Sequence, residues 1–298
     1  MITRLRPHFS RRGSTIGPTL GQTNHAIITG GSSGIGFALA CLFAARGISV
    51  SILARNSQRL ENSRKDILAL AADAANVEAI PCDVRLADSC RVAVEQAIAA
   101  NGPPDWAVAC AGIVKPGAFR TLSLDDHRSQ FETNFVGSLN FCHAVVPAMV
   151  ENGGGKLIFV ASGAALIGIY GYSGYCPSKF AVRGLAEVLR VELREHGILV
   201  ILAHPPDTHT PMLEYEAPLR PTATEEIAGA AGVWEPDQVA LAIIKGAQKG
   251  RFLIVPGIPL RLLSFLHSLI APAFRGYQGW IVKRCGRRNT SEPEHHSK

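Results

Sequence analysis

The sequence predicts an α/β fold in which one doubly wound parallel sheet forms a single domain. Short apolar runs alternate with longer helical stretches from residue 25 to residue 255. The runs are almost continuously apolar, as expected for parallel strands that helices cover on both faces. A glycine-rich turn at 29–36 joins the first run to the first helical stretch, which is typical of a βαβ unit. A ligand of such a sheet lies beyond the carboxyl ends of its strands.

Each expected strand is a run rich in Val, Ile and Ala that glycine, proline or polar residues bound. In chain order, the expected strands cover residues 25–29, 48–54, 77–82, 106–110, 156–161, 198–203 and 252–255. The segments between them place apolar residues at helical spacing. The expected helices cover residues 35–46, 57–75, 89–100, 123–149 and 173–195. After these, a Pro-rich loop at 204–221, of the kind that forms lids, precedes a helix that begins near Glu235.

Composition limits the classes of protein to which this chain can belong. Of its 298 residues, 47% are hydrophobic and 18% are charged, which excludes a membrane protein with many spans. The net charge of +6 gathers at the ends, since residues 251–298 hold eight Lys or Arg against Glu292 and Glu294. Such a charge favours an anionic membrane surface or nucleic acid, or it belongs to a solvated basic tail.

The seven cysteines are an odd number and include no CxxC pair, which predicts reduced thiols in a protein that faces the cytosol. We expect no metal centre. Residues 1–24 contain four Arg and no acidic residue, and they predict a disordered basic tail, with a transit peptide as the alternative.

The glycine-rich turn, with the sequence TGGSSGIG, predicts a phosphate-binding site. Its glycines let the backbone approach a pyrophosphate, which the N-terminus of the following helix stabilises. The expected contacts are Gly30, Ser32, Ser33, Gly34, Ile35 and Gly36. An acidic residue at the end of the second strand would favour NAD, but Arg55 follows Ala54 there. Because a guanidinium binds a 2′-phosphate, we expect NADP(H), with Ser33 and Arg59 assisting Arg55.

Tyr175 and Lys179 lie four residues apart at the start of an apolar helix and so share one face. An adjacent ammonium is expected to lower the pKa of the phenol and make Tyr175 an acid-base catalyst. Most such pairs are ordinary helix surface. Ser162 strengthens the catalytic interpretation, because it follows the strand at 156–161 and emerges where the cofactor should lie.

Residues 25–255 resemble the short-chain dehydrogenase/reductase family, with its Rossmann-like fold. The resemblance rests on motifs in the family's order and spacing: TGGSSGIG, Asp83-Val84, Asn134, Ser162 and Tyr175-Cys176-Pro177-Ser178-Lys179.

In this family the matching residues have defined roles. The resemblance implies that Ser162 polarises the substrate carbonyl, Tyr175 delivers the proton, and Lys179 binds the nicotinamide ribose and tunes Tyr175. It further implies that Asn134 holds a water in the proton relay and that Asp83 contacts the adenine ring. Val84, Ala111, Gly112, Pro205 and Thr208 are further expected cofactor contacts.

Two positions depart from the family pattern. Cys110-Ala111-Gly112 stands where Asn-Ala-Gly is usual, from which we expect altered packing without loss of activity. Pro205-Pro206-Asp207-Thr208 stands where Pro-Gly is usual. That run resembles the family members that reduce long-chain sphingoid ketones with NADPH.

Four other residues near the expected site have ordinary interpretations. Tyr170 and Tyr172 lack a Lys four residues on and are expected to be pocket wall or packing. His204 and His209 are expected to be satisfied loop histidines.

The segment after residue 257 is apolar but interrupted, and no run reaches the roughly 18 apolar residues of a spanning helix. One stripe has helical spacing: Leu260, Leu263, Leu266, Ile270 and Phe274. A basic cluster follows: Lys283, Arg284, Arg287 and Arg288. Together they predict an interfacial anchor on anionic lipid, with packing on the core or a second subunit as the alternative.

Three regions follow from these patterns: a tail at 1–24, a dinucleotide-binding catalytic domain at 25–257, and an apolar and basic segment at 258–298. We expect NADPH-dependent reduction of the ketone of a long-chain sphingoid base. The alternatives are a steroid- or retinoid-type dehydrogenase, a broad carbonyl reductase, and a cofactor-sensing binding protein without catalysis. We expect a homo-oligomer at the cytoplasmic face of a membrane, otherwise in the cytoplasm, without a nucleic-acid partner.

Overall fold

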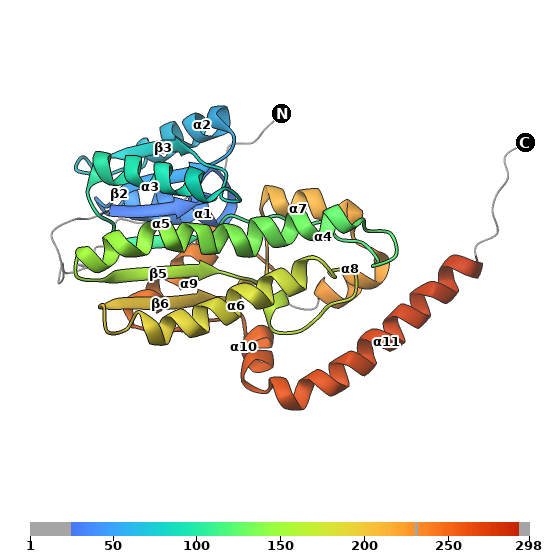
Figure 1. Ribbon diagram of the computed structural model, residues 1–298. Helices are drawn as coiled ribbons and strands as arrows, with labels where there is room; N and C mark the ends of the chain where they lie inside the picture. The colour runs from blue at the N-terminus through green and yellow to red at the C-terminus, as the bar shows by residue number, and fades with distance from the viewer. Residues whose placement is uncertain (1–24, 230–231, 292–298) are drawn as a thin grey trace, which may run out of the picture.

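A parallel sheet of seven strands forms the centre of the computed structural model, which describes residues 25–229 and 232–291 (Figure 1). The strands are β1 (His25–Thr29), β2 (Ser49–Ala54), β3 (Val77–Pro81), β4 (Trp106–Ala109), β5 (Gly155–Val160), β6 (Ile198–Ala203) and β9 (Leu253–Ile254). Their order is β3-β2-β1-β4-β5-β6-β9. The order reverses between β1 and β4, and a crevice for a ligand opens at such a point. The predicted fold class is confirmed; the tail expected at 1–24 lies outside the described residues.

Helices cover both faces of the sheet (Figure 1). One face carries α1 (Gly34–Ala44), α2 (Ser57–Leu68) and α9 (Pro236–Gln248). The other carries α3 (Ala87–Asn101), α5 (Gly137–Glu151) and α6 (Tyr175–Glu192). Successive strand side chains point to opposite faces, so Ile28 packs in the first layer and Ile27 in the second. This alternation explains why the strands are apolar throughout.

The helix expected at 123–149 is interrupted. It begins as α4 (Leu124–Phe131), where Ser123 and Asp126 form a capping box, and it continues into α5 through a π-helical turn at Glu132–Val136. Such turns are frequent at functional sites. A smaller difference concerns α2, which ends at Leu68, seven residues earlier than predicted, because the chain turns there towards β3.

The loop expected at 204–221 is largely structured, so that prediction was wrong. It holds β7 (Asp207–Thr208), which pairs with β8 (Val233–Trp234), and α7 (Pro211–Glu216). The helix begins there because the Thr210 hydroxyl accepts a hydrogen bond from the amide of Leu213 at 3.3 Å. A short helix, α8 (Thr222–Ala228), follows.

Two helices end the described chain: α10 (Ile258–Phe265) and α11 (His267–Ser291). The second packs Ile281 and Cys285 against Ala223 and Ile227 of α8. The side-chain amide of Gln278 also bonds the carbonyl of Gly168 at 2.9 Å, which ties α11 to the loop before α6. Among the described residues, no helix combines the length and the apolar character needed to cross a bilayer.

Candidate active site

The glycine turn lies between β1 and α1, close to the end of β4. Gly30 has φ +69°, and a Cβ there would lie 2.9 Å from the backbone of Ala111. A Cβ at Gly36 would lie 2.4 Å from the carbonyl oxygen of Gly30. Ser33 precedes α1 without using its side chain as a cap. The first backbone amides of α1 and the Ser33 hydroxyl are therefore available to donate hydrogen bonds to a phosphate. The glycine turn and these donors together fit a phosphate group.

The side of the turn facing the adenosine half of a dinucleotide is basic. Arg55 follows β2, and Arg59 lies in the first turn of α2; both side chains are exposed. The charge of Arg55 reaches the carboxylate of Asp83 and contributes to lowering its pKa. The structure thus brings Arg55 close to the expected adenine contact.

Asp83 follows β3, and its carboxylate is engaged by a residue that the sequence analysis did not single out. Arg85 donates from Nε to both oxygens, at 3.0 and 3.1 Å. These bonds are the main reason that the pKa of Asp83 is lowered. Val84 is buried and packs towards Gly137, where an added Cβ would lie 2.6 Å from Cγ2 of Val84. The side chain of Val84 thus packs against the start of α5.

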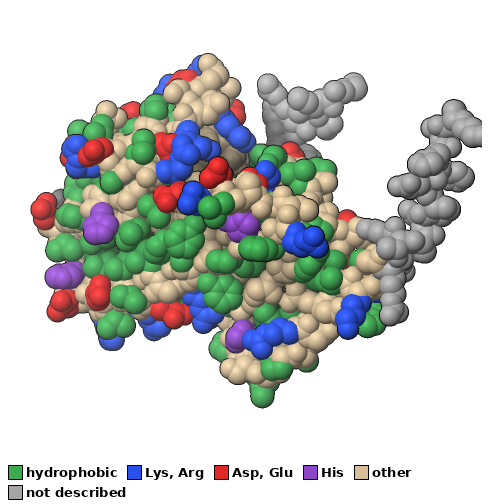
Figure 2. Space-filling model, turned by 45° about the vertical axis from the view of Figure 1, so that its right-hand side comes forward, with side chains coloured by type: hydrophobic (Ala, Val, Ile, Leu, Met, Phe, Trp, Pro, Cys, Tyr) green, Lys and Arg blue, Asp and Glu red, His purple; other side chains and the backbone are tan. Residues whose placement is uncertain are grey.

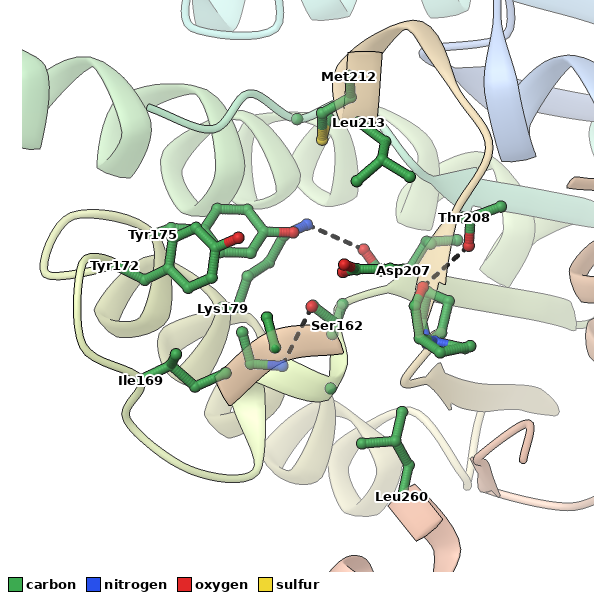
Figure 3. A pocket seen from close by; sticks show the side chains of 18 of the residues that line it. Ser162, Ile169, Tyr172, Tyr175, Lys179, Asp207, Thr208, Met212, Leu213 and Leu260 are labelled. Atoms are coloured by element: carbon green, nitrogen blue, oxygen red, sulfur yellow. Dashed lines mark hydrogen bonds between the residues drawn. The ribbon is translucent and has the colours of Figure 1, made fainter. Parts of the chain in front are cut away.

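Ser162, Tyr175 and Lys179 meet in one cavity at the carboxyl end of β5 (Figure 3). Ser162 follows β5, and its hydroxyl accepts a hydrogen bond from the amide of Ala164 at 3.1 Å. Tyr175 opens α6, one turn before Lys179. Nζ of Lys179 lies 5.7 Å from the centroid of the Tyr175 ring and donates to the carbonyl of Val160 at 3.1 Å.

Burial governs the protonation of this group. It raises the pKa of Tyr175, as does the negative charge of Glu216, while a hydrogen bond with Ser162 lowers it. Burial also lowers the pKa of Lys179 to about 8. The pKa of Tyr175 is therefore raised in the cofactor-free protein, where the sequence predicted a lowered one, because desolvation outweighs the groups that lower it, and the tuning role of Lys179 stays a prediction. Tyr175 holds its proton at neutral pH and can act as an acid.

Asn134 lies in the π-helical turn and is fully buried. Its Oδ1 accepts from the amide of Ile113 at 2.8 Å, and Nδ2 donates to the carbonyl of Ile113 at 3.0 Å and to the hydroxyl of Ser178 at 2.9 Å. Both N–H groups are thus bonded to protein, so a relay water could be held only by an oxygen of Asn134. The residue joins Ile113, in the loop after β4, to Ser178 of the catalytic helix.

Cys110 is partly buried at the position where the family usually has Asn. The Thr29 hydroxyl accepts hydrogen bonds from the amides of Cys110 and Ala111 at 3.0 and 3.2 Å, and it donates to the carbonyl of Val108 at 3.2 Å. Thr29 therefore supports this strand end through its side chain. Ala111 and Gly112 both line the cavity.

The segment after β6 closes over the glycine turn. A Cβ at Gly34 would lie 2.8 Å from Cγ2 of Thr210, and the carbonyl of Pro205 accepts from the amide of Gly163 at 2.9 Å. Pro205 and Thr208 line the cavity, as Gly30, Ser33 and Ile35 do. The Thr208 hydroxyl is bonded to the carbonyl of Pro206 at 2.9 Å.

His204 proves to support Ser162. It is fully buried, and Nδ1 lies 2.8 Å from the carbonyl oxygen of Ser162, to which it must donate. Burial lowers the pKa of His204 to about 4, so the ring is neutral. His209 is exposed and lies 3.8 Å from Glu235. Neither histidine lines the cavity. The expectation of a satisfied histidine was wrong for His204, because its Nε2 is buried without a hydrogen-bond partner among the described residues.

The cavity measures about 480 Å³ and becomes apolar away from Tyr175. Its outer wall consists of Ile167, Ile169, Met212, Leu213, Ile227, Leu260, Leu262, Leu263, Ile270 and Phe274. Most of the stripe expected to face lipid thus faces this cavity, because the chain breaks after α10 and turns back as α11. The other side of the same corner is exposed, with Ile258, Phe265 and Leu269 each about four-fifths exposed.

The sequence analysis did not predict that Tyr172, Asp207, Glu216 and Arg220 form one hydrogen-bonded group, here called the Glu216 cluster, of which the first three line the cavity. Glu216 accepts from the hydroxyl of Tyr172 at 3.0 Å and from Arg220 at 2.9 Å. Arg220 also donates to Asp207 at 2.7 Å. Tyr172 was expected to be pocket wall, which is confirmed.

Known proteins that are similar to this chain belong to the family that its motifs resemble. Residues 24–219 match the short chain dehydrogenase family. The chain is 37% identical over 251 residues to a 3-dehydrosphinganine reductase of Danio rerio, covering 83% of this chain and 75% of the relative. It is 36% identical to a 3-ketodihydrosphingosine reductase of Mus musculus, with the same coverage.

A solved structure of a short-chain type dehydrogenase/reductase from Mycobacterium marinum superposes with a TM-score of 0.70 at 30% identity, covering 79% of this chain and 94% of that one. The glycine turn, the cavity shared by Ser162, Tyr175 and Lys179, and these similarities lead to one conclusion: the chain is an oxidoreductase of the short-chain dehydrogenase/reductase family, whose members use NAD(P)(H).

Proposed function

We propose that this enzyme reduces the ketone of a long-chain sphingoid base, 3-ketodihydrosphingosine, with NADPH. The observation that supports this proposal most strongly is the cavity. Ser162 and Tyr175 lie at its inner end, and its apolar wall reaches α10 and α11. A single-chain lipid with a polar head fits such a shape. The relatives named for this reaction support the same substrate.

The catalytic roles follow from the positions of three side chains. Ser162 donates a hydrogen bond to the ketone oxygen, and Tyr175 delivers the proton that converts this oxygen to a hydroxyl. Lys179 lies one helical turn from Tyr175, where its ammonium stabilises the phenolate that remains. A nicotinamide cofactor, when bound, supplies the hydride. Asn134 acts as a positioning residue for the helix that carries Tyr175.

The cofactor of the proposed reaction is NADP(H). Arg55 and Arg59 are exposed beside the glycine turn, and the second strand ends on Ala54 without a carboxylate. A guanidinium stabilises a 2′-phosphate through charge-assisted hydrogen bonds, which a ribose hydroxyl cannot match.

We also propose peripheral attachment to the cytoplasmic face of a membrane. Ile258, Phe265 and Leu269 are exposed at the corner between α10 and α11, whose opposite side lines the cavity. The corner forms the lower end of the view in Figure 2, where hydrophobic, Lys or Arg and His side chains lie together. Burial of these apolar groups in a lipid surface stabilises attachment. All seven cysteines are free, which supports a cytosolic setting.

Within the basic cluster, Arg284 has a protein partner. It forms an ion pair with Glu226 of α8, and its guanidinium lies 4.4 Å from the Trp280 ring. Lys283 remains exposed and available to headgroups.

A homo-oligomer is the last part of the proposal. Val188 and Val191 of α6 are 52% and 75% exposed, and Phe180 of the same helix is 40% exposed. Three exposed apolar side chains on one helix favour contact with a second copy of the chain.

A substrate screen tests the reaction. Purified enzyme should oxidise NADPH with 3-ketodihydrosphingosine, also called 3-ketosphinganine. It should oxidise NADPH much more slowly with a steroid ketone or a small diketone. Preference for the steroid would support the steroid-type alternative, and equal rates would support a broad carbonyl reductase. No turnover with any ketone would revive the non-catalytic alternative.

A further inference from the structure

The Glu216 cluster lies in the cavity wall beside the catalytic phenol. The rings of Tyr172 and Tyr175 lie side by side (Figure 3), with centroids 5.7 Å apart. The Tyr172 hydroxyl donates a hydrogen bond to Glu216. Tyr172, Asp207 and Glu216 all line the cavity. The charge of Glu216 is close enough to Tyr175 to raise the pKa of the phenol. Any group bound at Glu216 is therefore a neighbour of the reacting ketone.

The cluster carries more negative than positive charge. Arg220 gives Nη1 to Asp207 and Nη2 to Glu216, so one guanidinium balances two carboxylates. The side chains of Glu216 and Arg220 are only 10% and 7% exposed. Carboxylates removed from water in this way need positive partners, and burial accordingly raises the pKa of Glu216.

The cluster is also incompletely hydrogen-bonded. Nε of Arg220 is buried and has no hydrogen-bond partner among residues 25–229 and 232–291. For Asp207, Oδ2 accepts from Arg220, while the side chain is 24% exposed and lines the cavity, so a ligand there can reach its carboxylate. The Nε–H of Arg220 can only donate and is no partner for a cation, whereas the carboxylate of Asp207 can accept hydrogen bonds from one.

We propose that Glu216 and Asp207 form a subsite for the ammonium group of the substrate, and this inference rests on the proposed function. A sphingoid ketone bears its amine on the carbon next to the carbonyl. When the ketone oxygen meets Tyr175 and Ser162, that amine must lie close to the same wall of the cavity. A cation there balances the charge of the cluster and makes charge-assisted hydrogen bonds to its carboxylates. Ketones without the amine gain nothing from the subsite, which makes it a determinant of specificity.

A pair of ketones isolates this contribution. The enzyme is assayed with 3-ketosphinganine and with 1-hydroxyoctadecan-3-one, which has the same chain, ketone and hydroxyl but lacks the amine. Glu216→Gln removes the charge and keeps the size of the side chain. We expect kcat/KM for the amino ketone to fall about tenfold or more relative to kcat/KM for the amine-free ketone, because a change in the pKa of Tyr175 affects both ketones alike. Asp207→Asn removes the other carboxylate and should reduce the preference for the amino ketone in the same direction.

Glu214→Gln is the matched control, because Glu214 lies on the same helix, is exposed and does not line the cavity. It should leave both ketones unaffected. An equal fall for both ketones in Glu216→Gln would overturn the subsite and leave Glu216 a structural role. If Glu216→Gln fails to fold, Asp207→Asn provides the test. An unchanged preference for the amino ketone over the amine-free ketone in Asp207→Asn would then overturn the subsite.

A binding measurement separates the subsite from the proposed reaction. Dissociation constants of sphinganine and of octadecane-1,3-diol, which lacks only the amine, are measured on the enzyme with NADP⁺ present. If sphinganine binds more tightly and Glu216→Gln abolishes this difference, the subsite is supported. This result would stand even if the wild-type enzyme fails to reduce 3-ketosphinganine and the proposed reaction is wrong. Equal binding of the two lipids to the wild type overturns the subsite.

Discussion

Nδ2 of Asn134 donates a hydrogen bond of 2.9 Å to the hydroxyl of Ser178, and this bond joins the π-helical turn to the helix of Tyr175 and Lys179. The Ser178 hydroxyl in turn donates to the carbonyl of Tyr175 at 2.7 Å. The position of the catalytic phenol therefore depends on an amide that need not touch the substrate.

Asn134→Ala should destabilise the protein, because it leaves the part-buried amide and carbonyl of Ile113 without their side-chain partner. We expect the free energy of unfolding to fall by about 2 to 4 kcal/mol in urea denaturation. Ser178→Ala keeps the bonds to Ile113 but removes those of the Ser178 hydroxyl with Asn134 and the Tyr175 carbonyl, and it should cost less, about 1 to 2 kcal/mol. An equal loss in both variants would mean that the bonds to Ile113 contribute little.

Tyr175→Phe keeps the buried ring and removes the acid. Turnover should fall by a factor on the order of 10² to 10⁴ while NADPH binding, followed by fluorescence, persists. Tyr170→Phe is the control, since Tyr170 is 37% exposed and does not line the cavity. Near-normal turnover in Tyr175→Phe would exclude this phenol as the proton donor.

Arg55→Asp should weaken NADPH binding by more than about tenfold, because it places a repelling charge beside the 2′-phosphate, while NADH is much less affected. Titration of both cofactors measures the effect. Arg128→Asp, an exposed substitution on α4, controls for net charge. If NADPH affinity is unchanged, the phosphate contact must lie elsewhere, with Arg59 the next residue to test.

Lys179→Met should stabilise the cofactor-free protein at pH 7. Burial lowers the pKa of Lys179 from 10.5 to about 8, so the folded state holds this charge at a cost on the order of 2 to 3 kcal/mol. The cost is present in full below pH 8 and vanishes as the pH rises past 10.5, where the amine is neutral in both states. Denaturation of both proteins from pH 7 to 10 should show the gap closing. A constant gap would contradict the lowered pKa.

Phe265→Glu combined with Leu269→Glu should weaken flotation with liposomes, because both side chains are exposed at the proposed lipid surface. Val191→Glu is the control: its side chain is 75% exposed on α6. Binding should be stronger to anionic than to zwitterionic vesicles, and Lys283→Gln should weaken only the anionic part. Unchanged flotation of the double variant would assign the corner to protein contacts.

Much of the fold could be predicted because parallel strands leave a strong signal. The runs at His25–Thr29 and Ile198–Ala203 were predicted with the bounds that the structure shows, since both faces of each strand are buried. The helix Pro211–Glu216 was missed because it is too short to show a periodic pattern. Thr210 before Pro211 was the available signal, as a cap followed by proline at the first helical position.

The residues of the candidate site also include some that could be predicted from the sequence and some that could not. Ser162, Tyr175 and Lys179 could be located because sequence spacing places them on fixed elements at one sheet edge. Glu216 and Arg220 could not, since two charges four residues apart are typical of a solvated helix face. Only the folded chain shows that they are buried beside Tyr175. The stripe that begins at Leu260 had the right spacing, but no pattern indicated that the chain would turn back at Leu266.

The π-helical turn at Glu132–Val136 also limits which insertions and deletions this protein can accept. Gln130 before the turn bonds the amide of Lys115 at 2.9 Å, while Phe141 after it packs under the sheet. Because one residue corresponds to a rotation of about 100° along a helix, deleting a single residue here would turn one half of the helix relative to the other. Either the Gln130 contact or the Phe141 packing would then be lost. A one-residue gap is thus more harmful inside this buried helix than in the exposed turn at 69–75.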